Sequence, residues 1–141
     1  MKTTLRCGIV GCGVIAGTHA RALQAEGRVE IAWCCDLIGE KASSLAEQFC
    51  IPNWTTDYRR VLDAPDVDFV CVCTEHAAHV AVAVDALAAG KDVLCEKALA
   101  ADTEGVQAMI RTHDTYPDRV FGVVFQHRFD PVNQLVKRLV E

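Results

Sequence analysis

Short apolar runs and amphipathic stretches alternate along the chain. Apolar runs bounded by turn residues predict strands, and apolar positions three or four residues apart predict helices. The run from Val67 to Cys73 is too uniformly apolar for a half-exposed strand, so we expect helices on both of its faces. Strands are expected at residues 5–10, 29–35, 67–73, 92–95 and 119–125, with a short extended piece near Trp54 and Thr55. Helices are expected at residues 14–25, 39–49, 77–89 and 102–115, with a helical turn from Asp57 and a final helix from Pro131.

This alternation predicts the fold class. Strands and helices joined by short connections form right-handed crossovers, which build a doubly wound parallel sheet between two helix layers, an α/β/α arrangement. The chain has 141 residues, of which 51% are hydrophobic. It is therefore long enough for one domain with a substantial core and too short for two full domains.

The turn after the first strand carries the most specific motif. In the segment Gly11-Cys12-Gly13-Val14-Ile15-Ala16, the glycines allow a tight strand-to-helix turn and close approach of backbone N–H groups to a pyrophosphate. Asp36 lies 20 residues after Ala16, at the end of the second strand, where an acid accepts hydrogen bonds from a ribose diol. Together they predict a dinucleotide-binding Rossmann unit. The expected cofactor contacts from the turn are Gly11, Cys12, Gly13, Val14 and Ile15.

Asp36 also predicts which dinucleotide binds. Its charge repels the 2′-phosphate of NADP, and no arginine follows immediately to offset that repulsion. Lys41, five residues further on, is the one nearby cation in the sequence. We therefore expect NAD to be the cofactor and NADP to be used less readily.

Eight cysteines are distributed mainly within apolar runs, where they resemble small core residues rather than a disulfide framework. No Cys-x-x-Cys pair exists, and Cys71 and Cys73 are expected to face the same side of one strand. We expect no metal site. Cys12 differs because a helix N-terminus can lower a thiol pKa; we nevertheless expect its backbone, rather than its thiol, to do the work.

Suggestive polar residues follow several predicted strands. Because ligands of open α/β sheets bind beyond the carboxyl ends of the strands, these residues are expected on one rim. They are Asp36, then Thr74, Glu75 and His76, then Glu96 and Lys97, and finally Gln126, His127 and Arg128. Each has an ordinary structural explanation, such as a helix cap or a surface ion pair. Beside a nicotinamide ring, however, Lys97 would hydrogen-bond a substrate hydroxyl, with Glu96 orienting the ammonium.

Four segments, in order and at suitable spacing, resemble the glucose-fructose oxidoreductase and inositol dehydrogenase (Gfo/Idh/MocA) family. They are Val10 to Ala16, Cys73 to His79, Ala88 to Lys97 and Gln126 to Pro131. The resemblance implies an NAD-binding domain of an oxidoreductase that transfers hydride between nicotinamide and an alcohol carbon of a sugar, cyclitol or related small molecule. It implies cofactor or substrate roles for Asp36, Thr74, Glu96, Lys97 and Arg128, with Lys97 as the catalytic residue.

The sequence departs from that family in three places. Ala98 stands where the family has a proline after the lysine, and Thr74-Glu75-His76 replaces Thr-Pro-Asn, so that His76 takes the asparagine's place beside the cofactor. The family also continues into a substrate domain. We therefore expect residues 1–125 to form the dinucleotide-binding domain and residues 126–141 to begin a linker and the first helix of a second domain. The chain alone should bind cofactor without efficient turnover, and any homo-oligomer would form through the missing domain.

Other classes of function are disfavoured. The net charge of −5 and the scattered basic residues argue against a nucleic-acid partner. Residues 77–90, the longest stretch of low charge, are too short to span a membrane, and the N-terminus has no apolar leader, so we expect a cytoplasmic protein. Two alternatives stay open: a non-catalytic nucleotide-sensing module, which would not need Lys97, and an S-adenosylmethionine-dependent methyltransferase.

Overall fold

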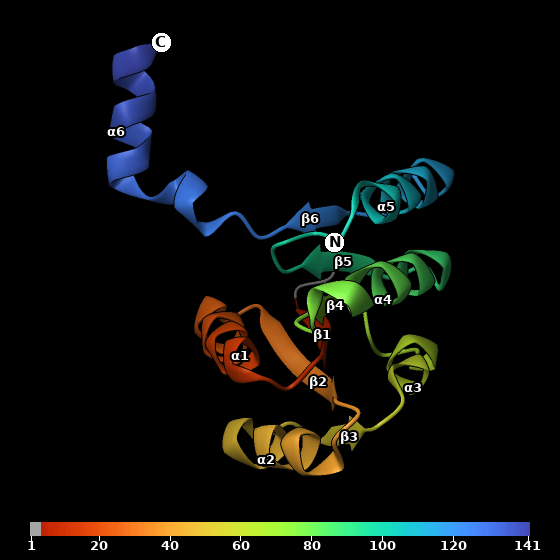
Figure 1. Cartoon of the computed structure of the whole chain (residues 1–141). Helices are drawn as coiled ribbons and strands as arrows, with labels where there is room; N and C mark the ends of the chain where they lie inside the picture. Colours follow the sequence, from red (N-terminus) through yellow and green to blue (C-terminus); the bar gives the residue numbers. More distant parts are fainter. Residues whose placement is uncertain (1–3) are drawn as a thin grey trace.

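The computed structural model describes residues 4–141 and forms one parallel sheet with helices on both faces (Figure 1). The strands are β1 (Leu5–Val10), β2 (Val29–Cys35), β3 (Asn53–Thr55), β4 (Phe69–Val72), β5 (Asp92–Cys95) and β6 (Phe121–Val123). The helices are α1 (Val14–Glu26), α2 (Gly39–Phe49), α3 (Tyr58–Asp63), α4 (His76–Ala88), α5 (Thr103–Thr115) and α6 (Pro131–Val140), with a 3₁₀ turn, η1 (Gln126–Phe129). The predicted α/β fold class is confirmed.

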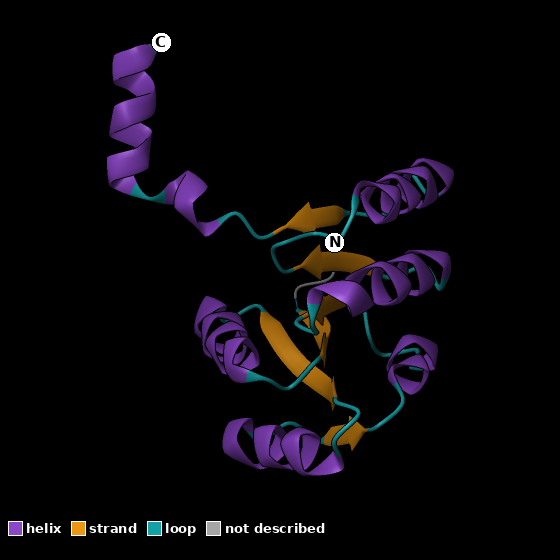
Figure 2. Cartoon of the chain, in the orientation of Figure 1, coloured by secondary structure: helices purple, strands orange, loops and turns teal. Residues whose placement is uncertain are grey.

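The sheet reverses its direction of growth between β1 and β4. Its strand order is β3-β2-β1-β4-β5-β6, and every neighbouring pair is parallel. The helices α1 and α2 lie on one face, and α3, α4 and α5 lie on the other (Figure 2). A ligand site is therefore expected beyond the carboxyl ends of β1 and β4, where the two halves separate.

Each face of the sheet has its own core. Under α1 and α2 the buried cluster includes Ile9, Ala16, Leu45 and Cys71, and under α3 to α5 it includes Val70, Val72, Leu87 and Met109. As predicted, β4 is covered on both faces, because its residues Val70 to Val72 are fully buried. The cysteines behave as core residues, and all but Cys50 are buried.

The predicted boundaries agree with most of the structure. The strands 5–10, 29–35 and 92–95 and the helix 39–49 are reproduced to the residue, and Asp57 and Asp102 cap α3 and α5 through bonds to backbone N–H groups. The helices predicted at 14–25, 77–89 and 102–115 differ from α1, α4 and α5 by one residue at one or both ends, and three differences are larger. The strands predicted at 67–73 and 119–125 are shorter because neighbouring strands pair only with residues 69–72 and 121–123, and η1 was not predicted.

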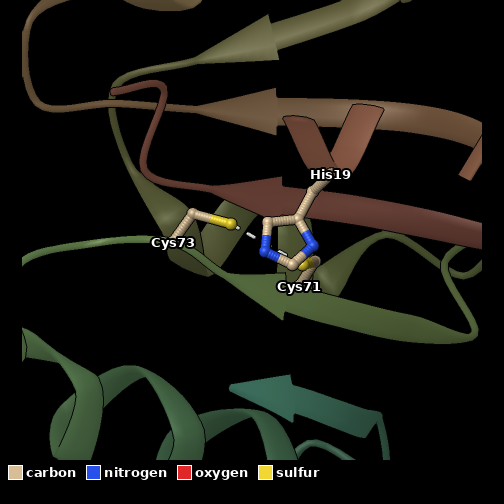
Figure 3. Close-up of side chains that lie close together, drawn as sticks. All are labelled: His19, Cys71 and Cys73. Carbon is tan, nitrogen blue, oxygen red and sulfur yellow. Dashed lines mark hydrogen bonds between the residues drawn. The ribbon is translucent and has the colours of Figure 1, made fainter. Parts of the chain in front are cut away.

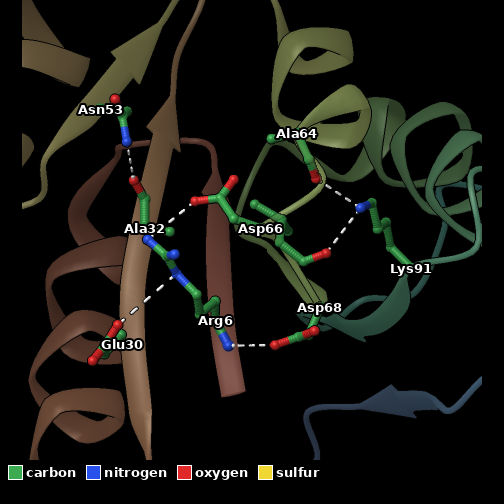
Figure 4. Close-up of polar contacts among 9 residues, drawn as sticks. Arg6, Glu30, Ala32, Asn53, Ala64, Asp66, Asp68 and Lys91 are labelled. Atoms are coloured by element: carbon green, nitrogen blue, oxygen red, sulfur yellow. Dashed lines mark hydrogen bonds and ion pairs between the residues drawn. The ribbon is translucent and has the colours of Figure 1, made fainter. Parts of the chain in front are cut away.

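Polar contacts tie together the amino-terminal edge of the sheet (Figure 4). The backbone N–H of Arg6 donates to Asp68, and its guanidinium lies 3.0 Å from the carboxylate of Asp66. Lys91, just before β5, donates from Nζ to the carbonyls of Ala64 and Val67, both at 2.8 Å. These contacts join the starts of β1, β4 and β5 and leave the opposite rim for ligands.

The segment after β6 departs from the sheet. Helix α6 extends away from the other helices (Figure 1), and its apolar side chains, which include Val132, Leu135, Val136 and Leu139, are exposed. Asp130 caps the helix by accepting a hydrogen bond from the Val132 N–H, and Pro131 occupies the first turn, as helix starts favour. Within residues 4–141, no helix combines the length and the apolar character needed to cross a membrane.

Candidate functional site

Gly11 brings the end of β1 against the segment that follows β4. Its φ is +94°, in the left-handed region, and its N–H donates to the Cys35 carbonyl at 2.7 Å. A Cβ atom at this position would lie 2.6 Å from backbone atoms of Cys73 and Thr74. No side chain fits there, so the first glycine of the motif is required both by backbone conformation and by this close approach.

Asp36 fixes the shape of the glycine turn. Its Oδ2 accepts the backbone N–H of Cys12 at 2.8 Å, and its Oδ1 accepts the N–H of Ile38 at 2.9 Å. These bonds orient the carboxylate at the end of β2. Because each carboxylate oxygen accepts more than one hydrogen bond, both retain capacity for a ligand hydroxyl.

The N-terminus of α1 is open. Gly13 is the N-cap residue, no side chain caps the helix, and a Cβ on Gly13 would meet no atom within 4 Å. Val14 and Ile15, in the first turn, are exposed. A hollow of about 570 Å³ adjoins this turn; its lining includes Gly13, Val14, Arg21, Ile38 and Lys41. The lining also includes the carboxylate of Glu40, so the uncapped N–H groups and the two cations together suit a phosphate group.

Cys12 contributes its backbone rather than a reactive thiol. Its sulfur lies 3.3 Å from the Cys35 carbonyl, and the contact with Cys34, together with burial, raises the pKa of the Cys12 thiol. A raised pKa disfavours the thiolate, which is the reactive form. These two causes therefore outweigh the lowering of the Cys12 pKa that the helix N-terminus was expected to produce.

Glu96, after β5, is buried and holds the backbone of its neighbour. Its Oε1 lies 2.7 Å from Nε2 of His19 on α1, and its Oε2 accepts the backbone N–H of Lys97 at 3.0 Å. We expected Glu96 to orient the ammonium of Lys97; both carboxylate oxygens instead contact the His19 ring and the main chain. The Lys97 side chain is exposed at the rim, and the Lys97–Ala98 peptide bond is cis.

His19 also meets two thiols, that of Cys71 on β4 and that of Cys73 just after the strand, on the face covered by α1 (Figure 3). One potential ligand atom from each of His19, Cys71 and Cys73 lies within 4.8 Å of the others, and the two sulfurs are 3.6 Å apart. Cys71 and Cys73 share a face, as predicted. The neighbouring Cys71, and then Glu96, raise the pKa of His19 to about 9, although burial opposes them. The contact with Cys73 and then that with His19 lower the pKa of Cys71. The polar atoms of this cluster thus satisfy one another, which explains how they can be buried.

His79 was missed by the sequence analysis as a residue of the site. It is fully buried in the first turns of α4, and its two ring nitrogens lie 2.9 Å from the Ala98 carbonyl and 3.0 Å from the Thr74 carbonyl. A signal existed: His79 is a lone polar residue within the run Ala77-Ala78-His79-Val80-Ala81. A buried histidine normally has hydrogen-bond partners, and here they belong to the two segments that follow β4 and β5.

The structure brings most of the predicted residues to one rim. Gly11, Asp36, Thr74 and Glu96 directly follow or lie just beyond the ends of β1, β2, β4 and β5. The exposed ring of His76 packs edge-on against that of His79. Arg128 is different: it is exposed in η1, beyond the edge strand β6, and within residues 4–141 no recorded side-chain contact joins it to the other candidates.

Comparison with known proteins places this geometry in a family. Residues 5–123 match the model of the Gfo/Idh/MocA oxidoreductase family, described as an NAD-binding Rossmann fold. The chain is 31% identical over 140 residues to inositol 2-dehydrogenase of Salmonella typhimurium, which covers 98% of this chain and 42% of the relative. It is 36% identical over 104 residues, 72% of this chain and 26% of the relative, to levoglucosan dehydrogenase of Pseudarthrobacter phenanthrenivorans. The chain spans about two fifths of the length of inositol 2-dehydrogenase.

Solved structures show the same fold. The WlbA dehydrogenase of Bordetella pertussis, solved with NADH and UDP-GlcNAcA, superposes with a TM-score of 0.91 at 27% identity, over 97% of this chain and 42% of that protein. The myo-inositol 2-dehydrogenase of Lactobacillus plantarum gives a TM-score of 0.90 at 25% identity, over 97% of this chain and 41% of that protein.

Proposed function

Because the chain belongs to the Gfo/Idh/MocA oxidoreductase family and forms its NAD-binding Rossmann domain, we propose that it binds NAD along the rim from Gly11 to Lys97. In the complete enzyme, bound NAD supplies the hydride acceptor, or as NADH the donor, for an alcohol carbon of a sugar, cyclitol or related small molecule. One observation carries the proposal: the uncapped N-terminus of α1 opens onto a hollow lined by Cys12 and Ile38, the two residues whose N–H groups orient the carboxylate of Asp36. The known relatives that act on inositol and levoglucosan support this substrate class.

The adenosine half of the cofactor is assigned to the ends of β1 and β2. The backbone N–H groups of Gly13, Val14 and Ile15 face the position of a pyrophosphate, and Asp36 accepts from the ribose hydroxyls. The negative charge of Asp36 opposes a 2′-phosphate. Arg21 and Lys41 line the hollow together with Glu40, so the two cations only partly offset the carboxylate charges near the ribose, and NADPH binding should be weaker than NADH binding but measurable.

The nicotinamide half is assigned to the ends of β4 and β5. Thr74 and His76 line the cofactor there, and Lys97 lies at the reacting end. The main chain of Lys97 is fixed by Glu96, whereas its exposed ammonium is free to donate a hydrogen bond from Nζ to the substrate hydroxyl. Lys97 would thereby orient the alcohol toward the nicotinamide. Arg128, on η1 just after the carboxyl end of the edge strand β6, would reach the cofactor or substrate from the edge of the sheet.

The same family supports a proposed arrangement in two domains. Residues 1–125 form the cofactor domain, and residues 126–141 begin a second, substrate-binding domain. The exposed apolar side chains of α6 include Val132, Leu135 and Leu139. They support this division because a contiguous exposed apolar surface normally packs against another part of the protein. A Rossmann domain by itself should bind NAD with little turnover, because the walls that position the alcohol and exclude water come from a substrate domain. Any homo-oligomer would form through the second domain.

A titration of the purified chain with NADH and, separately, NADPH tests the proposal. Energy transfer from Trp33 and Trp54 to the reduced nicotinamide reports binding. We expect saturable NADH binding, at least about tenfold tighter than NADPH binding, a difference of about 1.4 kcal/mol. Asp36→Ala should weaken NADH binding and reduce the difference between the NADH and NADPH affinities. Asp114 is exposed and remote from the rim, so Asp114→Ala should change neither affinity. Absence of binding to either nucleotide would overturn the proposal and favour a non-catalytic or S-adenosylmethionine-binding role.

A further inference from the structure

His79 joins two segments that the sheet itself leaves unconnected. The N–H of Glu96 donates to the Val72 carbonyl at 3.0 Å, which continues the ladder between β4 and β5. Beyond that bond the two segments diverge, and the His79 ring lies between the carbonyls of Thr74 and Ala98. One side chain of α4 thus spans the gap at the point where the rim begins.

The same short segment is held from the other face of the sheet. His19, from α1, contacts Glu96, and Glu96 accepts the N–H of Lys97. His79, from α4, contacts the carbonyl of Ala98, the residue after Lys97. The main chain on either side of Lys97 is therefore fixed by two histidines from helices on opposite faces of the sheet (Figure 2).

The chemistry of the ring suits a clamp of this kind. Both of its partners are carbonyl oxygens, which only accept hydrogen bonds, and a neutral imidazole has a single N–H to donate. The ring bridges both carbonyls when each of its nitrogens carries a proton, and with a single proton it donates to one of them. Because the ring is fully buried, bulk water does not compete for its N–H groups.

We propose that His79 is a positioning residue that sets Lys97 against the nicotinamide end of the cofactor by clamping the Ala98 carbonyl to the Thr74 carbonyl. This inference rests on the proposed function, since it takes Lys97 to lie beside the nicotinamide. His79 does not touch the reacting atoms. Its removal should disturb the nicotinamide half of the site and leave the adenosine half, at the ends of β1 and β2, intact.

Two ligands separate positioning from general support of the fold. NADH occupies both halves of the site, whereas ADP-ribose lacks the nicotinamide ring. Calorimetric titration of the whole chain should show that His79→Leu weakens NADH binding about tenfold, as loss of roughly one hydrogen bond would. ADP-ribose affinity should change by less than about twofold. His79→Gln keeps a side-chain N–H donor and should restore part of the NADH affinity.

His113 provides the matched control. Its Nε2 also lies 2.9 Å from a backbone carbonyl, that of Arg119, but in α5 and away from the rim. His113→Leu should therefore leave the ratio of the two affinities unchanged. If His79→Leu weakens the binding of NADH and of ADP-ribose by the same factor, or weakens the binding of neither ligand, His79 has no positioning role and the inference is wrong.

A second measurement tests the clamp even if His79→Leu folds poorly or the wild-type chain does not bind NADH. In ¹H–¹⁵N spectra without ligand, His79→Gln should shift the amide signals of Lys97 and Leu99 and leave that of Gly13 in place. Unmoved Lys97 and Leu99 amides would overturn the clamp. If these amides move but the wild-type chain does not bind NADH, the proposed function fails while the clamp itself stands.

Discussion

The two halves of the rim are built in different ways. At the ends of β1 and β2, backbone groups do most of the work: Gly11 lies against Cys73, and Asp36 accepts two N–H groups from residues close to the turn. At the ends of β4 and β5, buried side chains from two helix layers hold the main chain, His19 through Glu96 and His79 through Ala98.

This difference shows what each half requires. The first half needs space and backbone freedom, which glycine supplies, so the sequence encodes it in a short local motif. The second half needs buried polar groups to meet across the sheet, so its parts are far apart in the chain. His19 and Glu96, for example, are 77 residues apart. Mutations should therefore break the first half by adding atoms and the second by removing hydrogen-bond partners.

Gly11→Ala should have the largest effect. The new Cβ would lie 2.6 Å from the backbone after β4, and φ would stay at +94°, so we expect the free energy of unfolding to fall by about 4 kcal/mol. Urea denaturation followed by circular dichroism measures this. Gly13→Ala is the control, because its Cβ meets open space: stability should be retained while NADH affinity falls. Equal stability of the two variants would contradict the close approach at Gly11.

His19→Leu should come next. It leaves the buried carboxylate of Glu96 without its imidazole partner, which should cost about 2–3 kcal/mol in unfolding free energy. Adding Glu96→Gln, which removes the unpaired charge, should recover about 1 kcal/mol of that loss. Thr18→Leu, at an exposed neighbouring position of α1, is the control and should change stability by less than about 0.5 kcal/mol. If His19→Leu is as stable as this control, the His19–Glu96 contact contributes nothing to the free energy of unfolding.

Lys97→Ala should have the smallest effect on stability, within about 0.5 kcal/mol, because the side chain is exposed. In the complete enzyme it should slow hydride transfer, measured as the rate of NADH formation. Lys91→Ala is the converse control: it leaves the carbonyls of Ala64 and Val67 without their donor, so it should lower stability by about 1–2 kcal/mol and spare NADH binding. Unchanged hydride transfer in Lys97→Ala would show that Lys97 is not the catalytic residue.

Much of the fold could be predicted because hydrophobic periodicity is a local signal. The run that forms β4 identified a strand covered on both faces, and Asp57 and Asp102 marked where helices begin. The errors lay at the ends of elements, where pairing with a neighbour decides the boundary. Residues 124 and 125 are apolar enough for a strand, yet β6 ends at Val123 because its partner β5 ends at Cys95.

The sequence by itself determined the family and the parallel sheet, and it predicted the half of the proposed site built on Gly11 and Asp36, because a glycine turn and an acid at fixed spacing are properties of a continuous segment. Only the tertiary structure decided that Glu96 holds the main chain of Lys97 rather than its ammonium. Likewise, only the fold brings His19 and His79 to the same short segment from opposite faces of the sheet. The physical reason is that a buried polar side chain must find its partners across the packed layers, and sequence spacing does not specify which groups meet there.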